Sequence, residues 1–252
     1  MSLGHKVLRR RAADYVEKYS PNLIGITGSW GRAVTAAAIA AAIDNPSDAR
    51  VAPPDVDIVF GILGSNEKQR RGWMSRLARS KVKEATEEEP TTIVIEAAAK
   101  LPGDLDTIAR SFPFSHHGRW KVHDKRFKFF TRRELVAHEI VSIAMSLKPS
   151  GIAIINVDDP LLAPLTHNIH ANVIGFGESP AADIQLQHID RLSSGGFAVA
   201  IKTPQKIFET TFQNLPSKLH ISCVLAALAT VHILGEDAQA AARRLKQFKP
   251  PT

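Results

Sequence analysis

Apolar residues along this chain fall into two kinds of pattern that alternate with one another. Continuous apolar runs, which are typical of strands buried on both faces of a sheet, occur at residues 22–27, 56–62, 91–98 and 151–157. Apolar residues at helical spacing predict helices near residues 5–19, 32–43, 66–82, 102–110 and 132–147, with a further helix start at 158–160. Strands that alternate with helices indicate a parallel sheet with covered faces.

The pattern changes near residue 171. Short alternating strands separated by Gly, Pro and Ser follow at 172–177, 183–189, 196–202 and 206–212. They predict an antiparallel β-meander near residues 171–213. Two helical patterns close the chain at 217–234 and 237–248. The predicted fold class is therefore α/β, with a mostly parallel sheet, helices on both of its faces and a small antiparallel meander.

Composition narrows the class of protein. The 252 residues are 44% hydrophobic, enough for a sizeable core. A single cysteine cannot form an internal disulfide, and no secretory leader opens the chain. The longest apolar run, 36–43, is shorter than a membrane span. We expect a soluble, cytoplasmic protein without a membrane partner. Its net charge of +7 favours anionic partners, such as nucleotides, nucleic acid or acidic cell-wall precursors.

The stretch GITGSWGRAVT, residues 25–35, has the layout of a phosphate-binding loop between a strand and a helix. Gly28 and Gly31 supply the flexible backbone that lets N–H groups approach a phosphate. Arg32 stands where such loops carry lysine, and Ala33 stands where they carry a metal-binding hydroxyl. From these residues alone, a tight strand-to-helix turn without a ligand is an equal alternative.

Further segments resemble one enzyme family in the same order along the chain. They are IGITGSWGRAVT, VIEAAAKLPGDLDTIAR, KPSGIAIINVDDPLLAPL, VIGFGESPAADIQLQHI and LPSKLHISCVLAALATVHILG. Together they resemble the Mur ligases, ATP-dependent amide-forming enzymes of peptidoglycan precursor synthesis, and most of all the branch that adds D-alanyl-D-alanine to a muramoyl tripeptide. The resemblance implies a linker-like helix over 1–20 and a central ATP-binding domain over 21–250. The family's N-terminal UDP-binding and C-terminal domains are expected to be absent, and a partner protein that supplies them is one of the partners that the resemblance allows.

The resemblance also implies site residues. The phosphate loop corresponds to Gly28, Ser29, Gly31, Arg32 and Thr35, and the Mg²⁺ side corresponds to Glu96 and His123. Several family positions are changed in this chain. The lysine that is carbamylated in several members matches Ala137, and two asparagines on the adenine side match His220 and Cys223. We interpret Asn156, Asp158 and Asp159 mainly as a strand-to-helix turn, and His116 and His117 as loop.

Two hypotheses follow for function. The first is a Mur ligase-like protein that binds ATP weakly, with a UDP-muramoyl peptide as the family's substrate and with weak or lost catalysis in this chain alone. The second is a non-catalytic module for an anionic partner, either nucleic acid or a partner ligase. It rests on the basic and aromatic segment 119–133, which could stack bases but is favoured as a protected edge strand.

Overall fold

The fold is given by a computed structural model that describes residues 3–28, 30–52, 62–63, 90–97, 116–119 and 133–251. The helices expected at 66–82 and 102–110 lie outside these ranges. So does the strand expected at 56–62, except for its last residue. Ile62 is fully buried in a helical turn, where the sequence predicted a strand.

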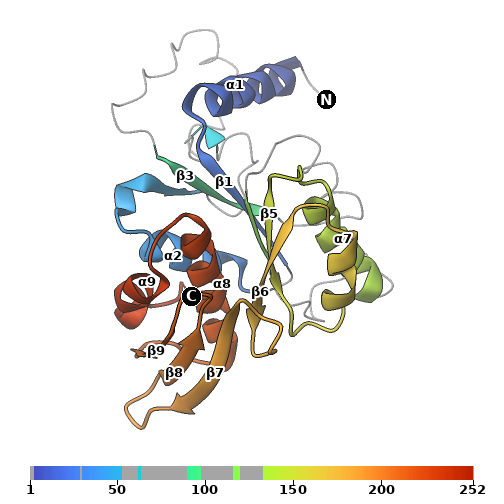
Figure 1. The fold of residues 1–252 in the computed structure, drawn as a ribbon. Helices are drawn as coiled ribbons and strands as arrows, with labels where there is room; N and C mark the ends of the chain where they lie inside the picture. Colours follow the sequence, from blue (N-terminus) through green and yellow to red (C-terminus); the bar gives the residue numbers. More distant parts are fainter. Residues whose placement is uncertain are drawn as a thin grey trace.

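The described strands form one sheet in the order β2-β3-β1-β4-β5-β6-β7-β8-β9 (Figure 1). All pairings from β2 to β7 are parallel, and β8 pairs antiparallel with both β7 and β9. The strands are β1 (Asn22–Thr27), β2 (Ala49–Val51), β3 (Thr92–Ala97), β4 (His116–Arg119), β5 (Ile152–Asn156), β6 (Asn172–Gly177), β7 (Ile184–Arg191), β8 (Phe197–Lys202) and β9 (Ile207–Phe212).

Helices cover both faces of this sheet (Figure 1). They are α1 (Leu3–Tyr19), α2 (Arg32–Ala42), α7 (Arg133–Met145), α8 (Lys218–Ile233) and α9 (Ala238–Arg244), with short 3-10 helices η1 (Pro46–Asp48), η3 (Ala163–Asn168) and η4 (Leu245–Gln247). One hydrophobic cluster packs α2, α8 and α9 against the sheet and the meander, and the other packs α1 and α7. Neighbouring residues of β1 divide between the clusters, Leu23 in one and Ile24 in the other, because side chains of a strand alternate.

The predicted α/β class is confirmed, with one change in where the parallel part ends. Strand β6 was expected to open the antiparallel meander, yet it pairs parallel with β5 from Asn172 to Phe176. It also pairs parallel with the first residues of β7. The antiparallel part therefore begins only at β7. The alternation of residues in β6 could not reveal this, because it reflects burial and not the direction of the neighbouring strand.

Two local predictions were wrong. His116 and His117 were expected in a loop, but they belong to β4, which lies between β1 and β5 in the sheet. Arg119 ends that internal strand, so it does not protect an edge. The helix expected to start at 158–160 is replaced by turns that lead into η3.

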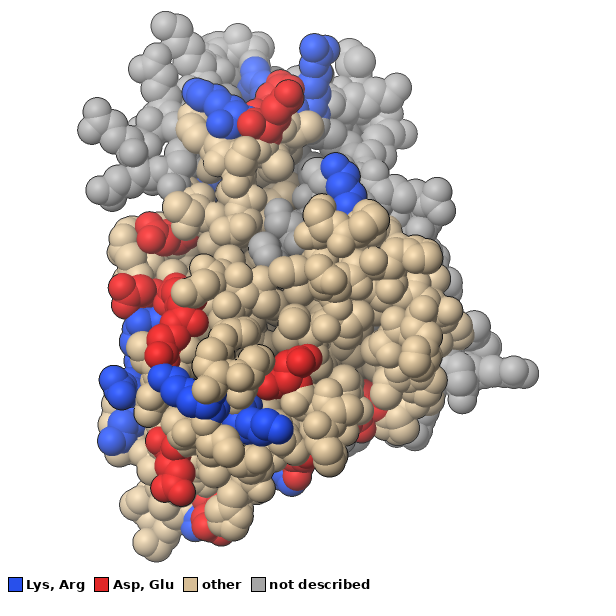
Figure 2. All heavy atoms as spheres, in the orientation of Figure 1, with Lys and Arg blue, Asp and Glu red and all other residues tan. Residues whose placement is uncertain are grey.

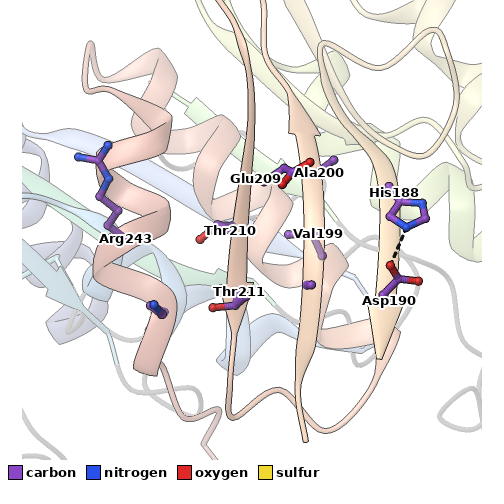
Figure 3. Close-up of a pocket in the computed structure, with 10 residues that line it drawn as sticks. His188, Asp190, Val199, Ala200, Glu209, Thr210, Thr211 and Arg243 are labelled. Atoms are coloured by element: carbon purple, nitrogen blue, oxygen red, sulfur yellow. Dashed lines mark hydrogen bonds and ion pairs between the residues drawn. The ribbon is translucent and has the colours of Figure 1, made fainter. Parts of the chain in front are cut away.

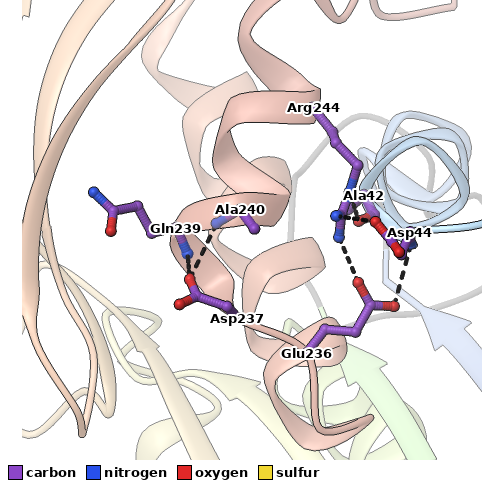
Figure 4. Close-up of polar contacts among 7 residues, drawn as sticks. All are labelled: Ala42, Asp44, Glu236, Asp237, Gln239, Ala240 and Arg244. Carbon is purple, nitrogen blue, oxygen red and sulfur yellow. Dashed lines mark hydrogen bonds and ion pairs between the residues drawn. The ribbon is translucent and has the colours of Figure 1, made fainter.

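A cluster of polar contacts joins α9 to the end of α2 (Figure 4). Arg244 donates from Nε to the Ala42 carbonyl at 2.6 Å and from Nη1 to Asp44 Oδ1 at 2.7 Å. Its Nη2 donates to Glu236, whose other carboxylate oxygen accepts from the Asp44 backbone N–H at 3.3 Å. One guanidinium thus ties the C-terminal end of α2 to the final helices.

Charges on the described surface are mixed in sign. In the view of Figure 2, Lys and Arg side chains alternate with Asp and Glu around α9 and the meander. Ion pairs of this kind include Lys206 with Asp237 and Lys218 with Glu178. On this face the described residues form no broad patch of one sign. The helices described are too short or too polar for any of them to cross a membrane.

Candidate functional site

The loop of residues 28–32, hereafter the anion loop, joins the end of β1 to the start of α2. Gly31 is the N-cap of α2 and adopts a left-handed backbone with φ 78° and ψ 2°. Gly28 also has a positive φ, of 145°. Both conformations favour glycine, because a Cβ would be strained there. The turn leads directly into α2, so the N-terminal end of that helix, where backbone N–H groups have no partner within the helix itself, lies next to the loop.

Arg32 is the first residue of α2, and its half-buried side chain turns back toward the loop. Its Nη1 donates a hydrogen bond to the Gly28 carbonyl. The guanidinium therefore braces the two ends of the loop and places a permanent positive charge beside the helix N-terminus. Ser29, also predicted to contact phosphate, lies outside the described residues.

Thr35 was predicted as the first retained hydroxyl of the loop. It is fully buried, and its Oγ1 donates to the Gly31 carbonyl at 2.8 Å. The hydroxyl is thus committed to the helix and does not face the loop's solvent side. Ala33 is exposed in the first turn of α2, but a methyl group cannot bind a metal. The first turn of α2 therefore offers no side-chain oxygen to a cation from these two positions.

The N-terminal half of α8 packs directly against the anion loop. Cys223 is fully buried, and its Sγ lies 3.8 Å from the Gly31 carbonyl oxygen. A Cβ on Gly31 would lie 3.0 Å from that sulfur. Burial raises the pKa of Cys223 to about 12, although a hydrogen bond with Thr35 acts in the opposite direction. The thiol is a packing group and not a nucleophile.

Trp30, which the sequence interpretation did not single out, occupies the middle of the anion loop. Its ring meets the ring of His220 on α8 edge to face, with centroids 5.2 Å apart and planes at 87°. His220 Nδ1 lies 2.8 Å from the hydroxyl of Ser217. Burial lowers the pKa of His220 below its ordinary 6.5. The sequence signal for this contact was a tryptophan between two loop glycines, because a large apolar ring in a short loop is expected to pack against a neighbouring element.

Glu96 lies on β3 beside the start of the loop. It pairs with Ile26 of β1, one residue before both strands end, and its side chain is half-buried. The predicted position at the carboxyl edge of the sheet is therefore confirmed, whereas a role with Mg²⁺ stays a prediction. His123 lies outside the described residues.

A Mg²⁺ ion would have few ligands of its own here. Within the described ranges, no three His, Cys, Asp or Glu side chains come together as a metal site. Mg²⁺ is commonly held by one or two carboxylates together with substrate phosphates. With Glu96 as the carboxylate near the loop among the described residues, a Mg²⁺ ion here would take most of its ligands from the phosphate oxygens of a nucleotide.

The segment of Asn156, Asp158 and Asp159 forms the turn that the sequence predicted. Asn156 Oδ1 accepts from the Asp158 N–H at 3.0 Å, and Asp159 Oδ1 accepts from the Leu161 N–H at 3.0 Å. The Asp158 carboxylate accepts the backbone N–H groups of residues 178 and 179 at 2.7 and 2.8 Å. Asn156 and Asp159 thus shape the turn itself, and Asp158 joins it to the loop after β6.

Ala137 lies on α7, on the side of the sheet opposite α2. It is buried at 1% exposure, within the cluster that packs α1 and α7. The position aligned with the carbamylated lysine therefore carries a small packing side chain without any functional group.

A matching family model identifies the chain. Residues 26–231 match the model described as the Mur ligase middle domain, and this segment includes the anion loop, Glu96 and most of α8. The chain belongs to the Mur ligase family, as a middle domain. The family resemblance predicted from the sequence motifs is thereby confirmed.

Relatives of two specificities are similar to this Mur ligase middle domain. The UDP-N-acetylmuramate–L-alanine ligase of Methylorubrum extorquens is 26% identical over 237 residues, covering 89% of this chain and 44% of the relative. The UDP-N-acetylmuramoyl-tripeptide–D-alanyl-D-alanine ligase of Mycobacterium leprae is 27% identical over 152 residues, covering 60% and 26%. The Thermotoga maritima MurF ligase, solved in complex with ADP, superposes with a TM-score of 0.72 at 21% identity, covering 94% and 51%. The chain thus spans about half the length of such relatives.

A second feature of this domain is a hollow of about 670 Å³ on the meander (Figure 3). Its lining includes His188 and Asp190 of β7, Glu209 and Thr211 of β9, and Arg243 of α9. His188 Nε2 lies 2.7 Å from Asp190 Oδ2, and each side chain is 67% exposed. None of the lining residues belongs to the anion loop, β1, β3 or α2. The hollow is an open groove, lined by both polar and apolar residues, that is distinct from the anion loop.

Proposed function

We propose that this domain binds the phosphates of ATP weakly at the anion loop, and that its ligase chemistry is weak or lost in this chain alone. The family activity is the ATP-dependent joining of an acid to an amino acid in peptidoglycan precursor synthesis. Its first step, phosphorylation of a carboxylate by ATP, needs the phosphates held and their charge neutralised. The anion loop retains groups suited to both tasks, namely the N-terminus of α2 and the positive charge of Arg32.

The observation that carries the proposal is the geometry of the Gly31 cap. Its left-handed conformation starts α2 directly behind the loop, with Arg32 folded over it and Glu96 at the same sheet edge. A helix N-terminus with a neighbouring cation binds phosphate through N–H groups and charge. The likeness to an ADP-bound MurF structure supports the same placement at the level of the fold.

The proposed loss of catalysis rests on groups that face elsewhere or are replaced. The Thr35 hydroxyl donates to the Gly31 carbonyl, and Ala33 has no side-chain oxygen. Ala137 contributes only a buried methyl group. Removing a single well-placed oxyanion donor from an enzyme costs about 2.7–4 kcal/mol of transition-state stabilisation. Several such losses leave binding feasible but make efficient turnover unfavourable.

Calorimetry with ATP, with and without Mg²⁺, tests the binding proposal. We expect weak affinity that changes little when the metal is removed, because Arg32 and the helix N-terminus carry the phosphates. Arg32→Ala should abolish binding. Arg243→Ala is the matched control, since Arg243 is an exposed arginine on α9. Tight binding with a strict Mg²⁺ requirement would overturn the proposal of a degraded loop.

A gain of function tests the same point in the opposite direction. The double variant Arg32→Lys with Ala33→Thr restores the lysine and the hydroxyl of a complete phosphate loop. Ala33 is exposed, so a threonine there meets no packed neighbour. We expect this variant to bind ATP more tightly with Mg²⁺ than without it, whereas the natural chain should not. If the two proteins showed the same dependence of ATP affinity on Mg²⁺, position 33 would not be the site of the lost metal-binding hydroxyl.

Turnover is tested with the purified full chain, ATP, a UDP-muramoyl tripeptide and D-alanyl-D-alanine. We choose this branch first because of the sequence motifs and because the M. leprae relative carries that name. L-alanine with UDP-N-acetylmuramate is the second pair, after the M. extorquens relative. We expect no phosphate release with either. Robust release that Glu96→Ala abolishes would show a working ligase.

A further inference from the structure

Strand β9 ends the described sheet and pairs with β8 on one side only. The Thr203 N–H donates to the Lys206 carbonyl at 2.8 Å and closes the hairpin between the two strands. Hydrogen-bonded pairs alternate with non-bonded pairs along an antiparallel ladder. The backbone groups of Ile207, Glu209 and Thr211 therefore point away from β8, toward the outer edge of the sheet.

This outer edge of β9 has hydrogen-bonding groups to offer. Within the described part of the chain, no group bonds to the backbone of Ile207, Glu209 or Thr211 on that side. The Gln213 N–H, next in the same series, donates outward to the Lys246 carbonyl at 3.1 Å, as the alternation requires. The sequence of β9, IFETTF, has none of the lysine or proline residues that commonly protect an edge strand. Such an edge is a template for a further strand.

Two basic side chains flank the edge. The groove of Figure 3 is lined by Thr210 and Thr211 of β9 together with Arg243 of α9 and Lys246 of η4. Both basic residues are exposed, and neither forms an ion pair with another described residue. Helix α9 packs in the same core cluster as Phe208, on the inner face of β9. The two cations therefore lie on the inner side of the edge.

A strand added to this edge would meet two different surfaces, because its side chains would alternate between the two faces of the sheet. On the inner side they would meet the positive charges of Arg243 and Lys246. On the outer side they would lie beside Glu209 and Thr211, where a further acidic side chain would be repelled. The complementary segment has an acidic residue at every second position and small polar residues between them.

A second copy of this chain fits the edge less well. In the antiparallel register that pairs all three open residues, Glu209 would lie opposite its own equivalent, and like charges placed directly opposite destabilise a strand pair. The same arrangement would bring Arg243 and Lys246 of both copies to one face of the joined sheet. The charges of this edge therefore favour an acidic partner over self-pairing.

We propose that the outer edge of β9 is a docking site for an extended segment of a partner protein, with acidic side chains at alternate positions facing Arg243 and Lys246. Backbone hydrogen bonds to Ile207, Glu209 and Thr211 give this complex its affinity, and the alternating charges give it specificity. The site shares no residue with the anion loop, so ATP should not compete with the segment.

Fluorescence anisotropy with labelled peptides at low salt tests the docking site. The probe is a peptide of about eight residues that alternates glutamate with threonine. One control peptide carries lysine in place of glutamate, and another carries the same glutamates in one block. We expect the alternating acidic peptide to bind at least about tenfold more tightly than the lysine peptide and about threefold more tightly than the block peptide. Lys246→Glu should weaken its binding by at least about threefold.

Two variants of one residue isolate the backbone contribution. Glu209→Pro removes the outward N–H, and an edge strand tolerates proline where that N–H makes no bond within the sheet. Glu209→Ala loses the same side chain but keeps the N–H. We expect Glu209→Pro to bind the acidic peptide at least about threefold more weakly than Glu209→Ala does, because one hydrogen bond is lost.

Amide hydrogen exchange of the natural chain gives a second measurement that needs no variant. Without peptide, the N–H groups of Ile207, Glu209 and Thr211 should exchange faster than those of the β9 residues between them, which bond to β8. The acidic peptide should slow exchange at these three groups. If Glu209→Pro does not fold, this measurement decides.

Several outcomes would overturn the proposal. Absence of binding, or equal binding of the lysine peptide, would show that Arg243 and Lys246 select no acidic segment. Equal affinities of Glu209→Pro and Glu209→Ala, or unchanged exchange at the three outward N–H groups, would show that no strand is added. Self-association of the natural chain that Glu209→Pro removes would mean that a second copy covers the edge.

Discussion

The sulfur of Cys223 lies 3.8 Å from the carbonyl oxygen of Gly31, so a residue of α8 packs directly on the turn that starts α2. The same carbonyl also accepts the backbone N–H and the hydroxyl of Thr35, at 2.9 and 2.8 Å. The anion loop is therefore shaped by a helix nearly two hundred residues away in the sequence. Its conformation depends on tertiary packing as well as on its glycines.

Gly31→Ala should destabilise the domain more than Gly235→Ala. Both glycines have a positive φ, 78° and 88°, but a Cβ at Gly235 meets nothing within 4 Å, whereas at Gly31 it meets Cys223 at 3.0 Å. A left-handed residue with a side chain costs about 1–2 kcal/mol, and overpacking adds about 1–3 kcal/mol. Urea unfolding of both variants measures the difference.

A double-mutant cycle identifies the cause of that difference. If the Cys223 contact is responsible, Gly31→Ala combined with Cys223→Ala should be more stable than the sum of the single effects predicts. Strict additivity, or equal losses in the two glycine variants, would show that the sulfur does not restrict the loop.

Cys223 should resist alkylation in the native protein. Its burial and its pKa of about 12 leave almost no thiolate at about pH 8. We expect iodoacetamide to label the native chain only as fast as it unfolds, and to label the urea-unfolded chain at the rate of an ordinary thiol. Because the chain has one cysteine, mass spectrometry reports this site alone. Fast labelling under native conditions would contradict the buried packing against Gly31.

Arg244→Met should lower the free energy of unfolding by about 1–3 kcal/mol. The Arg244 side chain is 25% exposed, and its guanidinium donates to the Ala42 carbonyl, Asp44 and Glu236. Its removal leaves acceptors without their donor. Arg243→Met is the matched control because Arg243, the preceding residue of α9, is exposed, and surface changes usually stay within about 0.5 kcal/mol. Similar values for the two variants would show that the polar cluster does not hold α9 to α2.

Asp237 should make a small, pH-dependent contribution to stability. The hydrogen bond from Lys206, aided by the backbone N–H groups of Ala240 and Gln239, lowers its pKa from 3.8 to about 2. Because the folded-state pKa is the lower one, the stabilisation is present above 3.8 and is lost as the pH falls through about 2. The carboxylate is 52% exposed, so water screens it, and we expect less than about 1 kcal/mol.

Asp237→Asn isolates this charge, because asparagine can still cap the helix. Thermal unfolding should show the variant to be less stable near neutral pH, and the two proteins should converge as the medium becomes acidic. A difference that persists unchanged into strong acid would have to arise from the cap geometry and not from the charge.

Sequence patterns by themselves determined the elements whose environment is uniform along their length. The apolar runs at β1, β3 and β5 lie where predicted because a strand covered on both faces needs apolar residues on both. The glycines of the anion loop and the position of Glu96 followed from motif order, since each motif lies within a short segment. Periodicity and local motifs record burial and backbone conformation, which neighbouring residues share.

Tertiary structure alone decided which distant segments meet. The polar sequence of β4 gives no sign of a strand. It nevertheless lies between β1 and β5 and pairs with both, because its backbone groups can hydrogen-bond to either strand whatever its side chains are. The contacts of Trp30 with His220 and of Arg244 with Ala42 likewise join residues far apart in the chain. Such contacts depend on the shape and polarity of both partners, and a pattern along one segment carries information about only one of them.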